Sequence, residues 1–142
     1  MSNPDELRAA IADARTVLKD AIAAAAAGWE RTPPGAADGE AGWSARQTAE
    51  HAIPTEAFFT TAVCDACGYP GVDEVKGDYA TAADALAHLD TVVEMCNKKL
   101  KYVSETDLEK KHEKFGSAAD LMGFNATHLS EHAAQIRAAA GV

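Results

Sequence analysis

The chain has 142 residues and a formal net charge of −9 at pH 7, with an isoelectric point near 4.9. This length is sufficient for one domain with its own hydrophobic core, and we predict a single domain over residues 1–142. The negative charge repels phosphate backbones and anionic lipids, which argues against a nucleic-acid or membrane partner. Alanine is abundant and aromatic residues make up only 6% of the chain, which favours an all-α fold built as a four-helix bundle.

The first predicted helix covers residues 4–28. Asn3 is its expected N-cap, and Pro4 occupies the first helical position, where proline is well tolerated. Apolar residues then recur at spacings of three and four, and Gly28 is the expected stop. Residues 30–42 follow as a long loop with three glycines. We expect this loop to cover one mouth of the bundle, and we assign no chemistry to it.

A capping box formed by Ser44 and Gln47 predicts the start of the second helix. Trp43 stands just before it, in the position of a hydrophobic staple. The helix is expected to end near Gly68.

One face of the second helix is expected to point inward and to carry His51, Thr55, Phe58 and Ala62. Pro54 interrupts this segment, because it cannot donate a hydrogen bond to the carbonyl of Glu50. We therefore expect a kink near Glu50 and His51.

The third helix is predicted to start at a capping box of Thr81 and Asp84, after an acidic, irregular segment at residues 72–79. Its apolar stripe consists of Leu86, Leu89, Val92, Val93, Cys96 and Leu100. Residues 104–111 predict a short extra helical turn before the last helix.

The last predicted helix covers residues 117–142 and begins with a capping box of Ser117 and Asp120. Spacings of three and four define one stripe on it, namely Leu121, Phe124 or Asn125, His128, Leu129, His132, Gln135 or Ile136, and Ala139. Two histidines, His128 and His132, therefore lie one turn apart within an apolar stripe.

Histidines within a buried stripe each need a partner, because burial removes the water that would otherwise bond to the imidazole. His51 is predicted on the inward face of a neighbouring helix. Three neutral imidazoles from two helices can hold a divalent metal and leave a coordination position open. A pair of ordinary hydrogen-bonded or solvent-facing histidines is the alternative, since His-x-x-x-His by itself is a weak motif.

The chain resembles the DinB/YfiT-like family of metalloenzymes. The resemblance rests on Trp43-Ser44 followed by His51, and on His128-x-x-x-His132 followed by Gln135-Ile136-Arg137. Helix order and loop placement agree over nearly the whole chain. The resemblance implies a four-helix bundle, often a homodimer, in which His51, His128 and His132 bind a divalent metal such as zinc or nickel.

Some members of that family are thiol transferases or thiol-dependent isomerases, in which the metal binds a low-molecular-weight thiol such as mycothiol or bacillithiol. A thiol on a metal is deprotonated, which makes it a nucleophile at neutral pH. The mycothiol-dependent maleylpyruvate isomerases of the family have a glutamate where this chain has His128, which argues against that reaction here.

Several other residues are candidates for supporting roles, and we expect each to be structural. Glu50 and Glu131 are sequence neighbours of the histidines, so a helix directs them away from the metal. The remaining residues of this group are Thr55, Tyr79 and Asn125. His88 is expected to be a surface or hydrogen-bonded histidine, with support of the metal ligands as the alternative, and His112 to be solvated within a charged run.

Cys64 and Cys67 form a Cys-x-x-Cys motif, which is compatible with a redox pair or half of a zinc site. A second ligand pair is missing, because Cys96 stands alone, so two ordinary thiols are the favoured interpretation. An odd number of cysteines and a polar, acidic start without a secretory signal lead us to expect a cytoplasmic protein.

Three functional hypotheses follow. The first is an enzyme whose metal activates a thiol or water toward a small electrophilic substrate, with no general base assigned. The second is a non-catalytic bundle that binds small molecules or acts in stress, with a structural or adventitious metal. The third is a redox or zinc module based on Cys64 and Cys67.

Overall fold

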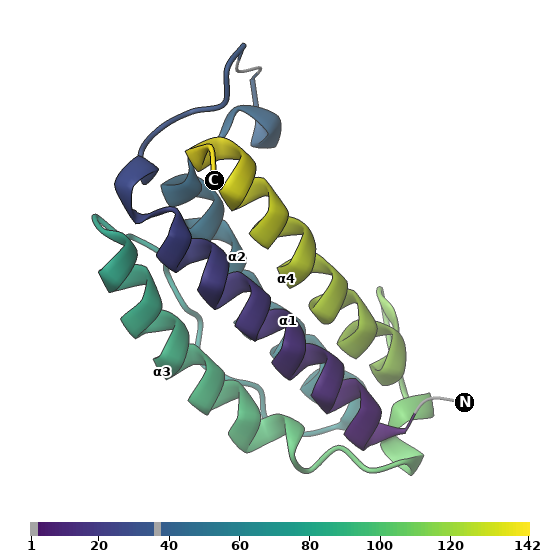
Figure 1. Cartoon of the computed structure of the whole chain (residues 1–142). Coiled ribbons are helices and arrows are strands. Elements are labelled where there is room, and N and C mark those ends of the chain that lie inside the picture. The colour runs from purple at the N-terminus through teal and green to yellow at the C-terminus, as the bar shows by residue number, and fades with distance from the viewer. Residues whose placement is uncertain (1–2, 36–37) are drawn as a thin grey trace.

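The structure is a computed structural model that describes residues 3–35 and 38–142. The described residues form four long helices: α1 (Pro4–Ala24), α2 (Ala45–Cys67), α3 (Ala82–Leu100) and α4 (Ala118–Ala140). They pack as a bundle (Figure 1), which confirms the predicted all-α fold. Shorter elements lie between them: the 3₁₀ helices η1 (Ala26–Gly28), η2 (Glu40–Gly42) and η3 (Thr106–Glu109), and a small hairpin of β1 (Lys111–His112) and β2 (Gly116–Ser117).

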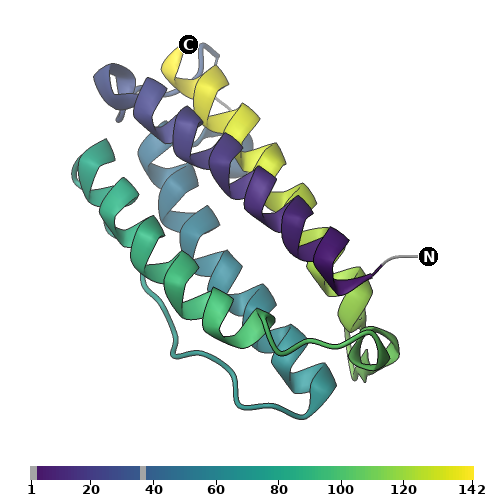
Figure 2. The same ribbon diagram turned by 60° about the horizontal axis from the view of Figure 1, so that its bottom comes forward.

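The connection between α2 and α3, residues 68–81, crosses the full length of the bundle, as Figure 2 shows, and is called the crossover segment. As a result α2 and α3 run in one direction, while α1 and α4 run in the other. The turn η1 that follows α1 meets the end of α4 closely, since a Cβ on Gly28 would lie 2.9 Å from the carbonyl oxygen of Ala140. The bundle thus has one long crossover connection of the kind that helical bundles tolerate.

Most of the predicted helix boundaries are confirmed by their caps. Ser44 and Ser117 each take part in a complete capping box. α2 and α4 end at Gly68 and Gly141, both in the left-handed conformation that glycine adopts without strain. The first helix is shorter than predicted: α1 ends at Ala24, and the tighter turn η1 covers the residues up to Gly28.

α2 runs without interruption through Pro54. The carbonyl of Glu50, which Pro54 leaves without its helical donor, faces the crossover segment. A Cβ on Gly77 would lie 2.3 Å from that carbonyl oxygen, so only a glycine allows the segment to approach so closely. The crossover segment therefore packs against the one turn of α2 whose backbone bonding is incomplete.

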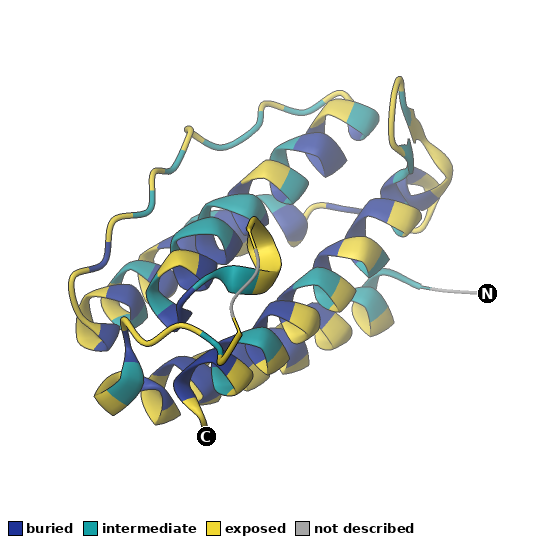
Figure 3. Cartoon of the chain, turned by 90° about the horizontal axis from the view of Figure 1, so that it is seen from above, coloured by how far each residue is buried: buried dark blue, intermediate teal, exposed yellow. Residues whose placement is uncertain are grey.

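The buried faces of the helices point toward one another and the exposed faces point outward (Figure 3). The inward face of α2 is rotated by one residue from the predicted one: Phe58 is 53% exposed, whereas Ala52, Ile53 and Glu56 are fully buried. On α4 the stripe passes through Asn125 and leaves Phe124 exposed. His51 consequently lies at the edge of the buried face of α2 rather than at its centre.

The core divides into two apolar clusters along the bundle axis. The first apolar cluster includes Leu18, Ile22, Ile53, Leu89, Val92, Leu129 and Ile136. The second apolar cluster includes Ile11, Val63, Leu100, Leu108, Leu121 and Met122. In the described ranges, no helix has the length and apolarity needed to cross a bilayer.

Candidate metal centre

Three histidines from two helices converge at one point in the structure. His51 comes from α2, and His128 and His132 come from α4. One ring nitrogen of each lies within 4.8 Å of the others. The Nε2 atoms of His128 and His132 are 2.8 Å apart. The structure thus brings together the three residues that the sequence analysis grouped.

The packing of α2 on α4 creates this meeting point. Ala49 and Ala52 of α2 and Ala133 of α4 are buried, and such small side chains let two helices approach closely. His132 is buried at 4% exposure, while His51 and His128 are half-buried. The site therefore has a closed floor at His132 and a rim that faces solvent.

His132 is held in a defined orientation by a chain of two hydrogen bonds. The Nε2 atom of Gln135 donates to the carbonyl oxygen of Glu40 over 2.6 Å. Because that carbonyl only accepts, the amide oxygen of Gln135 must face the Nδ1 atom of His132, which lies 2.8 Å away. Nδ1 of His132 therefore carries the proton, and its Nε2 lone pair is free for the centre.

Burial keeps the other two rings neutral. It lowers the pKa of His51 below its ordinary value, and the nearby His132 lowers it further. Burial and the neighbouring His132 and His51 lower the pKa of His128 to about 4. Neutral imidazole is the form that binds metals, so both rings are ready to coordinate at neutral pH.

The loop before α2 contributes a carboxylate that the sequence analysis missed. Glu40 in η2 places its Oε1 atom 3.6 Å from Nε2 of His132. The sequence analysis assigned no chemistry to this loop and did not single out Glu40. No local pattern marks Glu40, because its position depends on how the loop folds back over α4; residues 36–37 of this loop lie outside the described residues.

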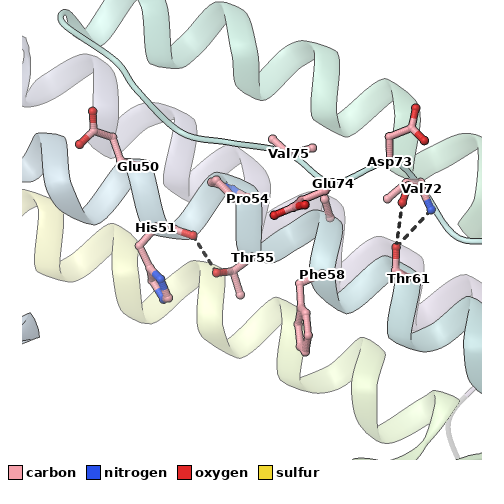
Figure 4. A pocket seen from close by; sticks show the side chains of 11 residues that line it. Glu50, His51, Pro54, Thr55, Phe58, Thr61, Val72, Asp73, Glu74 and Val75 are labelled. Atoms are coloured by element: carbon pink, nitrogen blue, oxygen red, sulfur yellow. Dashed lines mark hydrogen bonds between the residues drawn. The ribbon is translucent and has the colours of Figure 1, made fainter.

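Aromatic rings and a groove border the histidines. The ring of Trp43 lies 5.3 Å from that of His51, and the ring of Phe59 lies 5.6 Å from that of His128. His51 also lines a groove of about 620 Å³ between α2 and the crossover segment. Figure 4 shows this groove, with His51 pointing away from Glu50. Its walls combine apolar and acidic side chains: Pro54, Phe58, Val72 and Val75 with Glu50, Asp73 and Glu74.

Comparison with protein-family models identifies the family of this fold. The model of the DinB superfamily matches residues 6–136. This chain belongs to the DinB superfamily. Comparison with curated proteins and with solved structures finds no significant match.

The DinB superfamily is associated with metals, and the residues present here fit a divalent ion. Zinc binds imidazole nitrogens at about 2.0–2.1 Å, which requires donor atoms roughly 3–4 Å apart. The three donors of this DinB protein lie within 4.8 Å of one another, so small ring rotations bring them into range. Two neutral rings and a third ring oriented by Gln135 form a suitable donor set.

The remaining histidines and several of the supporting residues have structural partners of their own. Nδ1 of His88 lies 2.6 Å from the hydroxyl of Tyr79. His112 accepts a hydrogen bond from the backbone of Lys114. Thr55 donates to the carbonyl oxygen of His51 over 2.7 Å.

Glu50 also has partners away from the centre. Its carboxylate accepts a hydrogen bond from the backbone of Tyr79 and pairs with Arg46. This arrangement agrees with its orientation in Figure 4, on the opposite side of α2 from the His51 ring.

The cysteines lack the features of reactive thiols. Cys64, Cys67 and Cys96 are buried and form no disulfide. Burial raises the pKa of all three, to about 11 for Cys67 and about 12 for Cys96. Reactive cysteines have a lowered pKa and access to solvent. The arrangement therefore favours two ordinary thiols over a redox or zinc module at Cys64 and Cys67.

Proposed function

We propose that this protein is a divalent-metal-dependent enzyme that activates a low-molecular-weight thiol, or water, for transfer to a small electrophilic substrate. The observation that carries the proposal is the convergence of His51, His128 and His132, with donor atoms within 4.8 Å at a rim open to solvent. Zinc and nickel are the metals we expect, and mycothiol or bacillithiol the thiol. We further propose that the enzyme acts in the cytoplasm and forms a homodimer.

A metal bound here would lower the pKa of a thiol or water and so supply a nucleophile at neutral pH. The side chains of this chain have separate tasks. His51, His128 and His132 would hold the metal through their ring nitrogens, and Gln135 orients the ring of His132. Trp43 and Phe59 cover two of the rings and exclude water from that side.

The groove beside His51 supports a small-molecule substrate. Its volume of about 620 Å³ lies within the range of sites that bind drug-sized ligands, roughly 300–1,000 Å³. Phe58 and Val75 supply apolar surface for the body of a ligand in the groove that His51 also lines.

Elemental analysis of protein purified without added metal tests the metal site. We expect about one divalent ion per chain in the wild type and in a His88→Ala control, because His88 lies outside the centre. The His128→Ala variant should lose the ion while its circular dichroism stays helical. Full metal retention by His128→Ala would refute the assignment of the ligands.

Activity assays then test the reaction. The metal-loaded protein is incubated with mycothiol, bacillithiol or no thiol and a panel of small electrophiles. We expect consumption of thiol that requires the metal, or hydrolysis if water is the nucleophile. A panel in which the loaded wild type reacts no faster than His128→Ala would rule out the proposed chemistry for those substrates.

Glu40 favours a second candidate function. Its Oε1 atom lies 3.6 Å from Nε2 of His132, close enough for a small movement to make it a fourth protein ligand. A site closed by four protein ligands is typical of structural metals, and the protein would then be a non-catalytic bundle that binds small molecules or acts in stress. Cobalt substitution distinguishes the two, because added thiol changes the visible spectrum only if a coordination position is open.

A further inference from the structure

A buried polar layer separates the two apolar clusters of the core. On α2 the first cluster extends to Ala57 and the second begins at Ala62, so Thr60 lies between them and Glu56 lies at the edge of the first. On α4 Asn125 lies between Met122 and Leu129, and on α1 Arg15 follows Ala14, where the first cluster begins. The side chains of Glu56, Thr60, Asn125 and Arg15 are buried, with exposures of 0%, 1%, 2% and 7%. Because the same two clusters meet at or beside each position, the four residues lie at one level of the bundle.

This layer holds more polar atoms than its own side chains can pair. Arg15 donates to Glu56 and to Asn97. In the part of the chain that the structure describes, the buried side-chain atoms without a partner are Arg15 Nη2, Glu56 Oε2, Thr60 Oγ1, Asn125 Oδ1 and His128 Nδ1. Buried polar atoms in proteins are almost always bonded, and a group of them in one layer is characteristic of an internal water site.

Asn125 and His128 stand three residues apart on α4, and side chains at that spacing are neighbours with Cβ atoms about 5–6 Å apart. One water molecule can bridge the polar atoms of two side chains that are neighbours in this way. The other histidine of the pair offers a comparison, since His132 has Gln135 three residues after it and is bonded to it directly. An amide side chain therefore accompanies each histidine of α4.

We propose that Asn125 is a positioning residue that holds the ring of His128 through a buried water molecule. Oδ1 of Asn125 accepts one hydrogen bond from this water, and the water bonds to Nδ1 of His128. The proposal rests on the proposed metal site, because its consequence is the orientation of a ligand.

The tautomers of the histidine pair show why a water suits this position. Nδ1 of His132 carries its proton, so in the metal-free protein Nε2 of His132 accepts a hydrogen bond from the Nε2–H of His128 over 2.8 Å. Nδ1 of His128 then carries no proton, and its lone pair needs a hydrogen-bond donor. Coordination through Nε2 would leave the ring proton on Nδ1, which would then need an acceptor. A water molecule can donate a hydrogen bond to Nδ1 in the metal-free protein and accept one from it in the metal-bound protein. Asn125 keeps this water in place.

Zinc affinity, measured by competition with a chromophoric chelator, tests the proposal. The Asn125→Leu variant keeps the branched shape of the side chain but loses the acceptor, and we expect it to bind zinc about 10–100-fold more weakly. Asn125→Asp restores an acceptor at the same place and should retain or increase the affinity. Thr60→Val removes another unpaired group of the same layer and should bind as the wild type does. Wild-type affinity in Asn125→Leu would overturn the proposal.

A second measurement does not require the metal. Two-bond ¹H–¹⁵N correlation spectra of the metal-free protein report the state of each ring nitrogen. We expect the Nδ1 resonance of His128 to shift in Asn125→Leu and to stay unchanged in Thr60→Val. If the wild type binds no divalent metal, the metal-dependent function is refuted, and this spectrum alone decides the role of Asn125: an unshifted resonance would overturn it.

Discussion

At the scale of single residues, the candidate centre depends on how each imidazole is held. His132 is buried and tied through Gln135 to the backbone of Glu40. His51 and His128 stand at the rim, where burial lowers the pKa of each ring. The deepest ring is therefore fixed by hydrogen bonds, while the two outer rings stay neutral and open to a ligand.

The bond between Gln135 and His132 leads to the first prediction. The Gln135→Ala variant should lower zinc affinity by about 10–100-fold, because the ring of His132 loses the partner that fixes its tautomer. The affinity is measured by chelator competition. Gln135→Glu keeps an acceptor oxygen and should restore most of the binding.

Glu131→Gln is the matched control for this prediction. Glu131 precedes His132 in sequence but is exposed, so its variant should bind zinc like the wild type. Equal affinity of Gln135→Ala and Glu131→Gln would show that Gln135 does not orient the ring.

At the scale of the elements, local signals allowed most of the fold to be predicted. Capping residues such as Ser44 and Ser117 act within one turn, so the starts of α2 and α4 can be read from the sequence. Helical spacing also grouped the histidines of α4. It could not fix the rotation of α2, because the face with Phe58 and the face with Ile53, about 140° apart around the helix, both carry apolar residues. The approach of Glu40 to His132 depends on tertiary packing and left no local pattern.

The crossover segment provides the prediction at this scale. Gly77→Ala should lower the free energy of unfolding by about 2 kcal/mol or more, because the new Cβ would clash with backbone atoms that cannot move aside. That Cβ would lie 2.3 Å from the carbonyl oxygen of Glu50. Urea denaturation followed by circular dichroism measures the change.

Gly123→Ala gives the opposite result and serves as the control. Gly123 lies within α4, and a Cβ there would meet nothing within 4 Å. Alanine favours the helix, so this variant should be more stable by about 0.5–1 kcal/mol. A Gly77→Ala protein as stable as the wild type would mean that the crossover segment does not pack closely on α2.

At the scale of the whole molecule, the polar layer divides one bundle into two apolar halves. The first apolar cluster supports the end of the bundle that carries the histidines, and the second supports the end with the hairpin. Asn125 belongs to the layer and lies one turn from His128. The layer thus lies between the second apolar cluster and the first apolar cluster, which supports the candidate centre.

The ion pair of Arg15 and Glu56 is the only charged pair in this layer among the described residues, and it carries the last prediction. Removing one partner leaves the other charge buried, so Arg15→Met or Glu56→Leu alone should cost about 3–5 kcal/mol of unfolding free energy. The double variant replaces the pair with apolar side chains and should recover most of that loss. A double-mutant cycle in urea measures the coupling between the two residues. Losses that simply add would show that the two charges do not depend on each other, and the layer would then not be a coupled unit.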